Sequence, residues 1–126
     1  MRYLGIDWGL KKIGLALSEG EIASPFVTLK VKSLPDAIKQ VVTIVQQGQV
    51  KVVVIGHPEG KMGELVERVA KLLQQKKIKV VLTDETLSTQ DAKKEMVKLG
   101  FGKKARRDDN TMASSIILQR FLDEKK

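Results

Sequence analysis

The chain has 126 residues, which suffice for one compact domain and are too few for two ordinary ones. Its 23 Lys and Arg outnumber its 15 Asp and Glu, so the formal net charge is +8, and its 42% hydrophobic and 30% charged residues exclude a disordered or fibrous protein. Because it has no cysteine, disulfides, thiolate metal sites and cysteine nucleophiles are excluded, and we expect a cytoplasmic protein. No apolar run reaches the roughly 18 residues of a membrane-spanning helix, and no signal-peptide pattern is present, so we expect no membrane partner. The positive charge favours a polyanion such as nucleic acid, although many small basic proteins bind none.

Three short apolar runs, separated by tight turns, begin the chain. They cover residues 3–7, 13–17 and 22–29, and their short spacers predict an antiparallel meander of three strands. Pro25 lacks the amide hydrogen that a central strand needs, so the third strand is expected at an edge of the sheet.

The apolar spacing then changes to that of helices alternating with strands. Residues 34–45 predict an amphipathic helix with Ser33 as its N-cap and Gly48 as its stop, and residues 65–73 predict another. Strands are predicted at 52–55, where a β-branched run is typical of a strand covered on both faces, and at 80–82. Further helices are predicted over 88–100 and about 108–122. This order indicates a single α/β domain over residues 1–126, with one mixed sheet in which the meander joins parallel strands.

Acidic residues follow two of these strands and begin the last helix. Asp7 ends the first strand, Glu85 follows the fifth, and residues 108–110 read Asp-Asp-Asn. Since ligands bind beyond the carboxyl ends of parallel strands, Asp7 and Glu85 are expected on one side of the sheet, with the helix start supplying a third acid. Such oxygen ligands suit Mg²⁺ or Mn²⁺, and paired metals promote phosphodiester cleavage. The alternatives are an Asp7 bonded to turn amides, a surface Glu85, and a capping role for Asp108 or Asp109, which is the commoner role for such a pair.

A cluster of cations lies just before that last helix. Seven fall within fifteen residues, namely Lys93, Lys94, Lys98, Lys103, Lys104, Arg106 and Arg107. Those from Lys103 to Arg107 are candidates to bind phosphates on either side of a scissile bond, and Lys11 and Lys12 extend the same surface. The alternative is a solvated loop beside a helix.

Two further side chains have both a functional and a structural interpretation. Trp8 follows Asp7 and is suited either to stack on a base or to pack beside the strand end. His57, the sole histidine, follows a strand and is either a general base or, more commonly for a histidine in a turn, a structural residue. Gly56 and Gly60 are expected to shape their loop, because no phosphate-loop pattern is present.

Four segments together resemble the successive motifs of one family. They read GIDWGLKKIGLALS (5–18), VVVIGHP (52–58), TDETLST (83–89) and MASSIILQRFLD (112–123). In this order and spacing they resemble the YqgF-type pre-16S rRNA nucleases, also called Holliday-junction-resolvase-like proteins. The resemblance implies an RNase H-like fold with a five-stranded mixed sheet and helices on both faces. It also implies hydrolysis of phosphodiesters dependent on Mg²⁺ or Mn²⁺, and trimming of the 5′ end of pre-16S rRNA.

The resemblance also implies roles for individual residues. Asp7 matches the family's first-strand Asp, and Glu85 matches its catalytic Glu, although Thr86 stands where the family has Arg. Asn110 stands where the last helix usually carries Asp, so Asp109 is expected to take over that role. The predicted catalytic residues are thus Asp7, Glu85 and Asp109, and the predicted metal ligands are these three with Asn110.

Three other functions compete with an rRNA nuclease. The same chemistry fits cleavage of branched DNA at a four-way junction, and Asn110 fits a nucleic-acid-binding protein that has lost catalysis. The spacing from Asp7 to Gly14 also resembles the phosphate loop of actin-like ATPases, but those enzymes need two such domains. The expected partner is therefore pre-16S rRNA or branched DNA, bound by a monomer or a homodimer.

Overall fold

A computed structural model of the chain describes residues 2–84 and 109–124, apart from the side chain of residue 109. The elements in chain order are β1 (Arg2–Asp7), β2 (Lys12–Glu19), β3 (Ala23–Lys30), α1 (Leu34–Gln47), β4 (Val50–His57), α2 (Lys61–Gln75), β5 (Lys79–Asp84) and α5 (Asp109–Glu124). Each of these was predicted from the sequence, with bounds that differ by a few residues. The helix predicted over 88–100 lies outside the described residues. Neither described stretch contains a helix long and apolar enough to cross a membrane.

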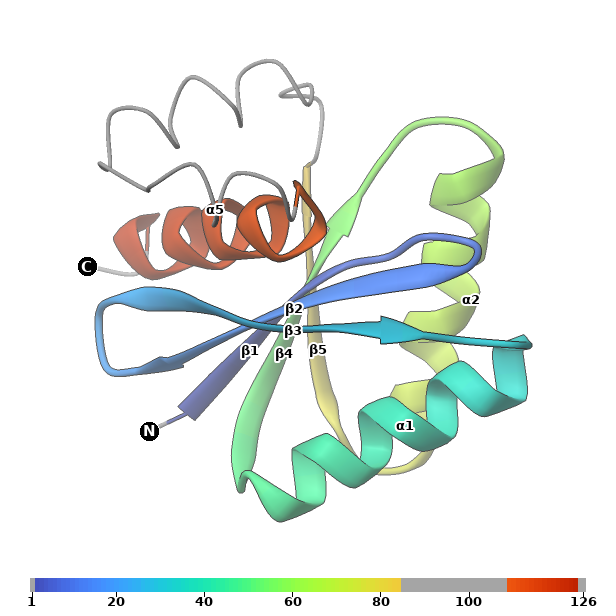
Figure 1. Cartoon of the computed structure of the whole chain (residues 1–126), viewed down its shortest axis with the longest axis horizontal. Helices are drawn as coiled ribbons and strands as arrows, with labels where there is room; N and C mark the ends of the chain where they lie inside the picture. The colour runs from blue at the N-terminus through green and yellow to red at the C-terminus, as the bar shows by residue number, and fades with distance from the viewer. Residues whose placement is uncertain (1, 85–108, 125–126) are drawn as a thin grey trace.

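The five described strands form one mixed sheet with the order β3-β2-β1-β4-β5. Strand β1 runs antiparallel to β2, which runs antiparallel to β3, whereas β1, β4 and β5 are parallel to one another. The predicted meander joined to parallel strands is therefore confirmed. Because β1 lies at the centre of the sheet, its carboxyl end is flanked by β2 on one side and β4 on the other (Figure 1).

Helices cover both faces of this sheet, as predicted. Helices α1 and α2 lie on one face and α5 on the other (Figure 1). Successive residues of a strand alternate between the faces, so Leu4 and Ile6 pack in the core with α1 and α2, whereas Tyr3 packs in the core with α5. We call these the α1/α2 face and the α5 face.

The ends of α1 show how local sequence fixes the α1/α2 face. The Ser33 hydroxyl accepts a hydrogen bond from the Asp36 backbone N–H at 3.2 Å, so the predicted N-cap is confirmed. The helix ends at Gln47 with Gly48 as its C-cap, so the predicted stop is confirmed. Gly48 keeps a right-handed conformation, and the next residue, Gln49, takes the left-handed one with φ 52°.

Glycines in β1 and β2 let α5 approach the sheet closely. A Cβ added at Gly5 would lie 2.6 Å from Leu118 Cβ and 2.8 Å from the Ser114 carbonyl oxygen. A Cβ added at Gly14 would collide with the Asn110 carbonyl group and lie 2.8 Å from Asn110 Cβ. Larger residues at these two positions would therefore lift the helix from the strands.

The other end of α5 is tied to the turn between β2 and β3. The Ala23 N–H donates to Gln119 Oε1 at 2.9 Å, and Gln119 Nε2 donates to the Glu21 carbonyl oxygen at 2.9 Å. The rings of Tyr3 and Phe121 meet edge to face with centroids 5.8 Å apart. Helix α5 is thus fixed along its length, which sets where its first turn lies.

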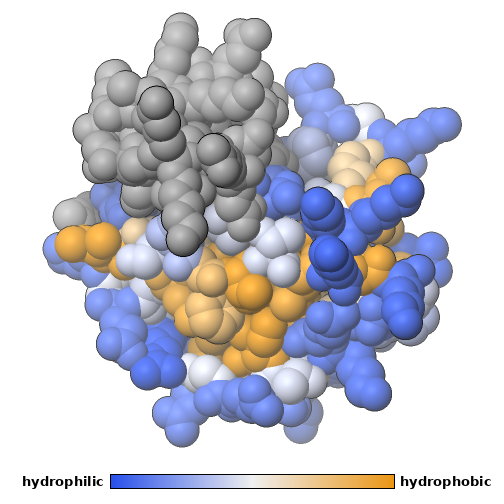
Figure 2. Space-filling view, viewed as in Figure 1, coloured by the Kyte–Doolittle hydropathy of each residue, from blue (hydrophilic) through white to orange (hydrophobic). Residues whose placement is uncertain are grey.

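Strand β3 is an edge of the sheet, as Pro25 predicted. The pairing of β2 with β3 is interrupted between Leu15 and Ala16, and Phe26, which no β2 residue pairs with, is 50% exposed. Figure 2 shows hydrophobic residues gathered over this strand, with hydrophilic residues around them. The proline and the irregular pairing make the edge a poor template for another strand.

Candidate functional site

The Asp7 side chain lies on the α5 face of the sheet, at the carboxyl end of the central strand. Asp7 ends β1 with the same strand parity as Tyr3 and Gly5, which both contact α5, and it is half-buried. In the antiparallel register it lies opposite Gly14 of β2. On its other side, Gly56 of β4 comes one residue after the Ile6–Ile55 pair, so two glycines flank this carboxylate.

The start of α5 is brought to the same place by Gly14. The backbone of Asn110 lies directly against Gly14, whose strand partner is Asp7. Paired residues on neighbouring antiparallel strands have Cα atoms about 4.5–5.5 Å apart. The first turn of α5 therefore contacts the residue that lies directly beside Asp7 in the sheet. Asn110 itself is half-buried. The structure thus brings together two of the four residues predicted as metal ligands.

The donor chemistry of these two residues fits a hard divalent cation. Asp7 offers carboxylate oxygens and Asn110 an amide oxygen, the ligand types that Mg²⁺ and Mn²⁺ take. Among the described side chains, those of residues 2–84 and 110–124, no three acidic or histidine groups lie close enough to hold a metal together. The other two predicted ligands, Glu85 and the Asp109 side chain, lie outside the described residues, so their placement stays a prediction.

The predicted nucleic-acid contacts divide in the same way. Lys11 and Lys12 are exposed at the start of β2, at the same end of the sheet as Asp7. Their turn is tightly folded, because a side chain at Gly9 would collide with the Lys12 carbonyl oxygen, and the Val31 N–H donates to the Lys11 carbonyl oxygen at 3.0 Å. The remaining predicted contacts, Lys103, Lys104, Arg106 and Arg107, lie outside the described residues.

Trp8 is buried in the core and is not placed to stack on a base. The residue is only 6% exposed and packs in the core of the α1/α2 face. This burial excludes the interpretation that its ring stacks on a base. Strand parity explains this outcome, because Trp8 continues the side of Ile6 rather than that of Asp7. The packing interpretation is therefore the correct one.

His57 lies on the opposite side of the sheet from Asp7. It has the parity of Val53 and Ile55, which pack in the core with α1 and α2. Its Nε2 lies 3.3 Å from Glu67 Oε1 of α2 but is not aligned for a hydrogen bond with it, and the side chain is 35% exposed. The structural interpretation of His57 is thus supported, because a base that faces α2 does not share a site with Asp7.

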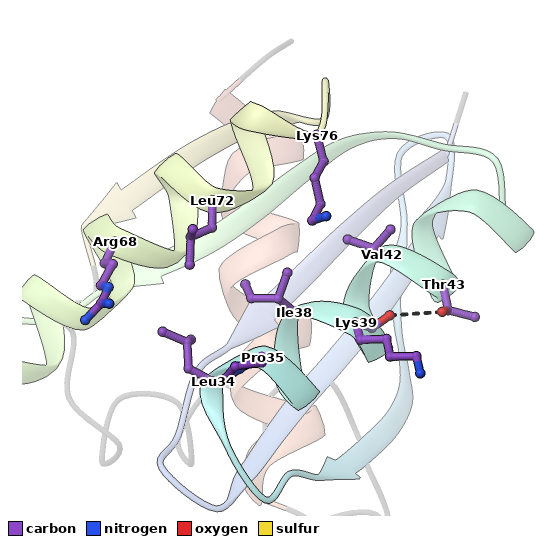
Figure 3. Close-up of a pocket in the computed structure, with 9 residues that line it drawn as sticks. All are labelled: Leu34, Pro35, Ile38, Lys39, Val42, Thr43, Arg68, Leu72 and Lys76. Atoms are coloured by element: carbon purple, nitrogen blue, oxygen red, sulfur yellow. Dashed lines mark hydrogen bonds between the residues drawn. The ribbon is translucent and has the colours of Figure 1, made fainter.

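A large groove also lies away from Asp7. It is about 710 Å³ in volume and runs between α1 and α2, on the outer side of the α1/α2 face (Figure 3). Its floor is largely apolar, with Ile38 and Leu72 among the lining residues, and cations such as Lys39, Arg68 and Lys76 line it as well. The sheet separates this groove from Asp7, so it is not part of the candidate site.

Two residues of this region escaped the sequence analysis. Apart from its place in the phosphate-loop spacing, Gly14 had no predicted role, although a glycine inside a strand signals the close approach of another backbone. Lys30 pairs directly with Lys12 across β2 and β3. Its position could have been found only by fixing the register of the meander, which the irregular pairing at Leu15 and Ala16 obscures.

Comparisons of the sequence with known proteins agree with the geometry. A family model described as "RuvX: Holliday junction resolvase" matches residues 1–124. A protein of Caldanaerobacter subterraneus subsp. tengcongensis named "Putative pre-16S rRNA nuclease" is 37% identical over 138 residues, which cover 100% of this chain and 99% of that protein. A protein of Dictyoglomus thermophilum with the same name is 34% identical over 133 residues, with 98% and 96% covered.

Similar solved structures share the fold at low sequence identity. RuvC of T. thermophilus in complex with a Holliday junction substrate has a TM-score of 0.66 and 16% identity, with 99% of this chain and 95% of that chain covered. The Holliday junction resolvase of fowlpox virus has a TM-score of 0.72 and 10% identity over the whole of both chains. These neighbours identify the fold as RNase H-like, which confirms the fold expected from the motifs.

Proposed function

We propose that this chain, which is a nuclease and belongs to the RuvX family, is a divalent-metal-dependent endonuclease that processes the 5′ end of pre-16S rRNA in the cytoplasm. Its full-length similarity to relatives named as pre-16S rRNA nucleases supports this substrate. One structural observation carries the proposal. Asp7, at the end of the central strand, lies opposite the glycine that seats the first turn of α5.

In this proposal Asp7, Glu85 and Asp109 are the catalytic acids, and Asn110 completes the set of metal ligands. A bound Mg²⁺ or Mn²⁺ supplies a more acidic water and neutralises charge on the leaving oxygen. The chain's own contribution is to gather carboxylates at the carboxyl end of the central strand, within a molecule whose net charge is +8. Asn110 contributes an oxygen without charge, so the neutralisation of the cation falls on the three acids.

The basic residues then hold the substrate. Lys11 and Lys12 stand at the same end of the sheet as Asp7, and Lys103, Lys104, Arg106 and Arg107 immediately precede α5 in the sequence. We propose that they bind phosphates on both sides of the scissile bond. Such contacts fix the position of the nucleic-acid strand but do not recognise its base sequence.

The test is cleavage of a 5′-extended 16S precursor RNA by the purified full chain, with Mg²⁺ or Mn²⁺ and with EDTA. We expect cleavage only with metal, and a loss of at least about 100-fold in Asp7→Asn and in Glu85→Gln, since even an outer-shell partner of a metal is worth about 10–100-fold. Asp123→Asn is the matched control, because this acid lies on the last turns of α5 and bonds Gln119. Undiminished cleavage by both variants would exclude the proposed roles.

Branched DNA is the second candidate substrate. The description of the family and the neighbour solved with a junction favour it. Since the fold and the metal chemistry are common to both substrates, the choice lies in surface contacts. Competition between a four-way DNA junction and the precursor RNA, at matched salt, decides between them. Preferential cleavage of the RNA supports our proposal, and preferential cleavage of the junction overturns the substrate assignment.

Asn110 favours a third candidate, a nucleic-acid-binding protein with weak catalysis or none. It predicts binding that weakens with salt but no cleavage stimulated by metal. The variant Asn110→Asp restores the acid that the family's pattern carries at this position. A large gain in its cleavage rate would show that the natural chain has a weakened ligand, whereas an unchanged rate in a chain that already cleaves would show that no acid is needed at this position.

A further inference from the structure

Two lysines stand directly opposite each other beside the candidate site. Lys12 begins β2 and Lys30 ends β3, and the antiparallel register pairs them. Both are exposed. Val27 and Leu29 pack with the core of the α1/α2 face, so the alternation of β3 puts Lys30 on the α5 face, and the parity of Gly14 puts Lys12 there as well. The lysine pair, Lys12 and Lys30, therefore shares a face with Asp7.

Such a pair is unfavourable for the folded chain alone. Like charges directly opposite on neighbouring strands repel, with Cβ atoms about 4.5–5.5 Å apart. Within the described residues neither lysine forms an ion pair. Asp36, the acid at the start of α1, instead accepts hydrogen bonds from the Lys32 backbone N–H at 2.9 Å and from Gln40 Nε2 at 3.1 Å.

The backbone around the lysine pair is nevertheless held firmly. Gln40 Nε2 donates to the Lys30 carbonyl oxygen at 3.1 Å, and the Val31 N–H donates to the Lys11 carbonyl oxygen at 3.0 Å. The end of β3 is thus fixed to both α1 and the turn before β2. Since neither lysine has an ion-pair partner among the described residues, two lysines on a firmly held backbone offer a site for an anion.

The spacing matches a phosphate near the proposed site of cleavage. Lys12 is two residues from Gly14, the strand partner of Asp7, and Lys30 is one strand further away. At about 3.4 Å per residue and 4.8 Å per strand, the Cα of Lys30 lies about 12 Å from that of Asp7. With the scissile phosphate at Asp7, this distance would place Lys30 beside a neighbouring phosphate of the same polynucleotide.

We propose that Lys12 and Lys30 together bind a single phosphate of the substrate backbone, next to the scissile phosphodiester at Asp7. The lysine pair is a positioning site. The shared phosphate relieves the repulsion between the two ammonium groups, and its binding fixes which phosphodiester of the nucleic acid lies at the carboxylates. This inference rests on the proposed nuclease function, to which it adds Lys30 and the shared phosphate.

The test is the salt dependence of binding in EDTA, where no metal-dependent cleavage occurs. The probes are a 5′-extended 16S precursor RNA and a four-way DNA junction, and the variants are Lys12→Ala, Lys30→Ala and the double variant. A lost phosphate contact lowers the slope of log affinity against log salt by about 0.7 for single strands and 0.9 for duplex DNA. We expect the double variant to lose about one such contact, not two, on the preferred substrate. Lys71→Ala, on α2 of the other face, is the control and should keep the wild-type slope.

Thermal stability separates a binding role from a structural one. Because either substitution removes like-charge repulsion, we expect the melting temperature of each single variant to rise by about 1 °C while binding weakens. An unchanged slope in the double variant would overturn the proposal, and so would a loss of two contacts in it or a fall in the melting temperature of the single variants. Metal-dependent cleavage by the unaltered chain is measured separately, so the lysine pair can fail while the nuclease function stands, and the reverse.

Discussion

Replacement of Gly14 by alanine tests whether the first turn of α5 belongs to the site. The new Cβ would collide with the Asn110 carbonyl group and lie 2.8 Å from Asn110 Cβ, whereas an ordinary contact begins at 3.4 Å. The start of α5 must therefore retreat by more than half an ångström. Overpacking of this kind costs about 1–3 kcal/mol, partly offset by about 0.4–1 kcal/mol from the stiffer unfolded chain. We expect a net destabilisation of about 1–2 kcal/mol.

The displaced turn carries Asn110 and the backbone of residue 109 away from Asp7. Since a misplacement near 1 Å costs about 100-fold in rate, Gly14→Ala should lower RNA cleavage by up to about that factor at a temperature where the variant is fully folded. Urea unfolding followed by circular dichroism gives the stability, with a midpoint lowered by about 1 M. Single-turnover cleavage of the precursor RNA gives the rate.

Gly5→Ala is the matched control for this variant. Its Cβ would press on Leu118 and Ser114, in the middle of α5, so it should cost similar stability but much less activity. A Gly14→Ala variant that unfolds at the wild-type urea concentration would refute the close approach of helix and strand. One that loses stability but cleaves at the wild-type rate would refute a role for the start of α5 in the site.

Three further substitutions test the structural roles assigned above. Trp8→Ala should destabilise the chain by about 3–5 kcal/mol, seen as a lower urea midpoint, because Trp8 is a core residue; a loss of RNA affinity at unchanged stability would contradict this. Ser33→Ala should cost about 1 kcal/mol through the lost N-cap of α1, again by urea unfolding, and an unchanged midpoint would show that the cap contributes nothing. His57→Gln should cleave RNA within about twofold of the wild-type rate, whereas a general base would contribute roughly 10²–10⁴-fold.

Most of the fold follows from local sequence. The helical spacing of residues 34–45 and the β-branched run at 52–55 each favour one structure, and Pro25 locates an edge strand without any tertiary information. The bounds of the elements were predicted less accurately. Helix α2 begins at Lys61, before its apolar spacing starts. Its N-cap is Gly60, which has φ 78° and forms no side-chain cap that the sequence could have signalled.

The candidate site was harder to predict, because it depends on which face of a strand each residue takes. Asp7 and Trp8 are neighbours in sequence, yet the alternation of β1 carries them to opposite sides of the sheet. His57 is separated from Asp7 for the same reason. The close seating of α5 on Gly14 is a contact between residues nearly one hundred apart. A glycine within a strand can signal that another backbone approaches, but the local sequence does not say which segment it is.

The proposed function requires that a divalent cation binds at Asp7, beside the start of α5. Titration of the ¹⁵N-labelled chain with Mn²⁺ tests it directly, because the paramagnetic ion broadens the NMR signals of nearby amides. We expect the amides of Asp7, Gly14 and Asn110 to broaden first, that of Leu72 in the distant groove to stay sharp, and the selective broadening to disappear in Asp7→Asn. Broadening that is scattered over the surface, or that Asp7→Asn leaves unchanged, would contradict a metal site at Asp7.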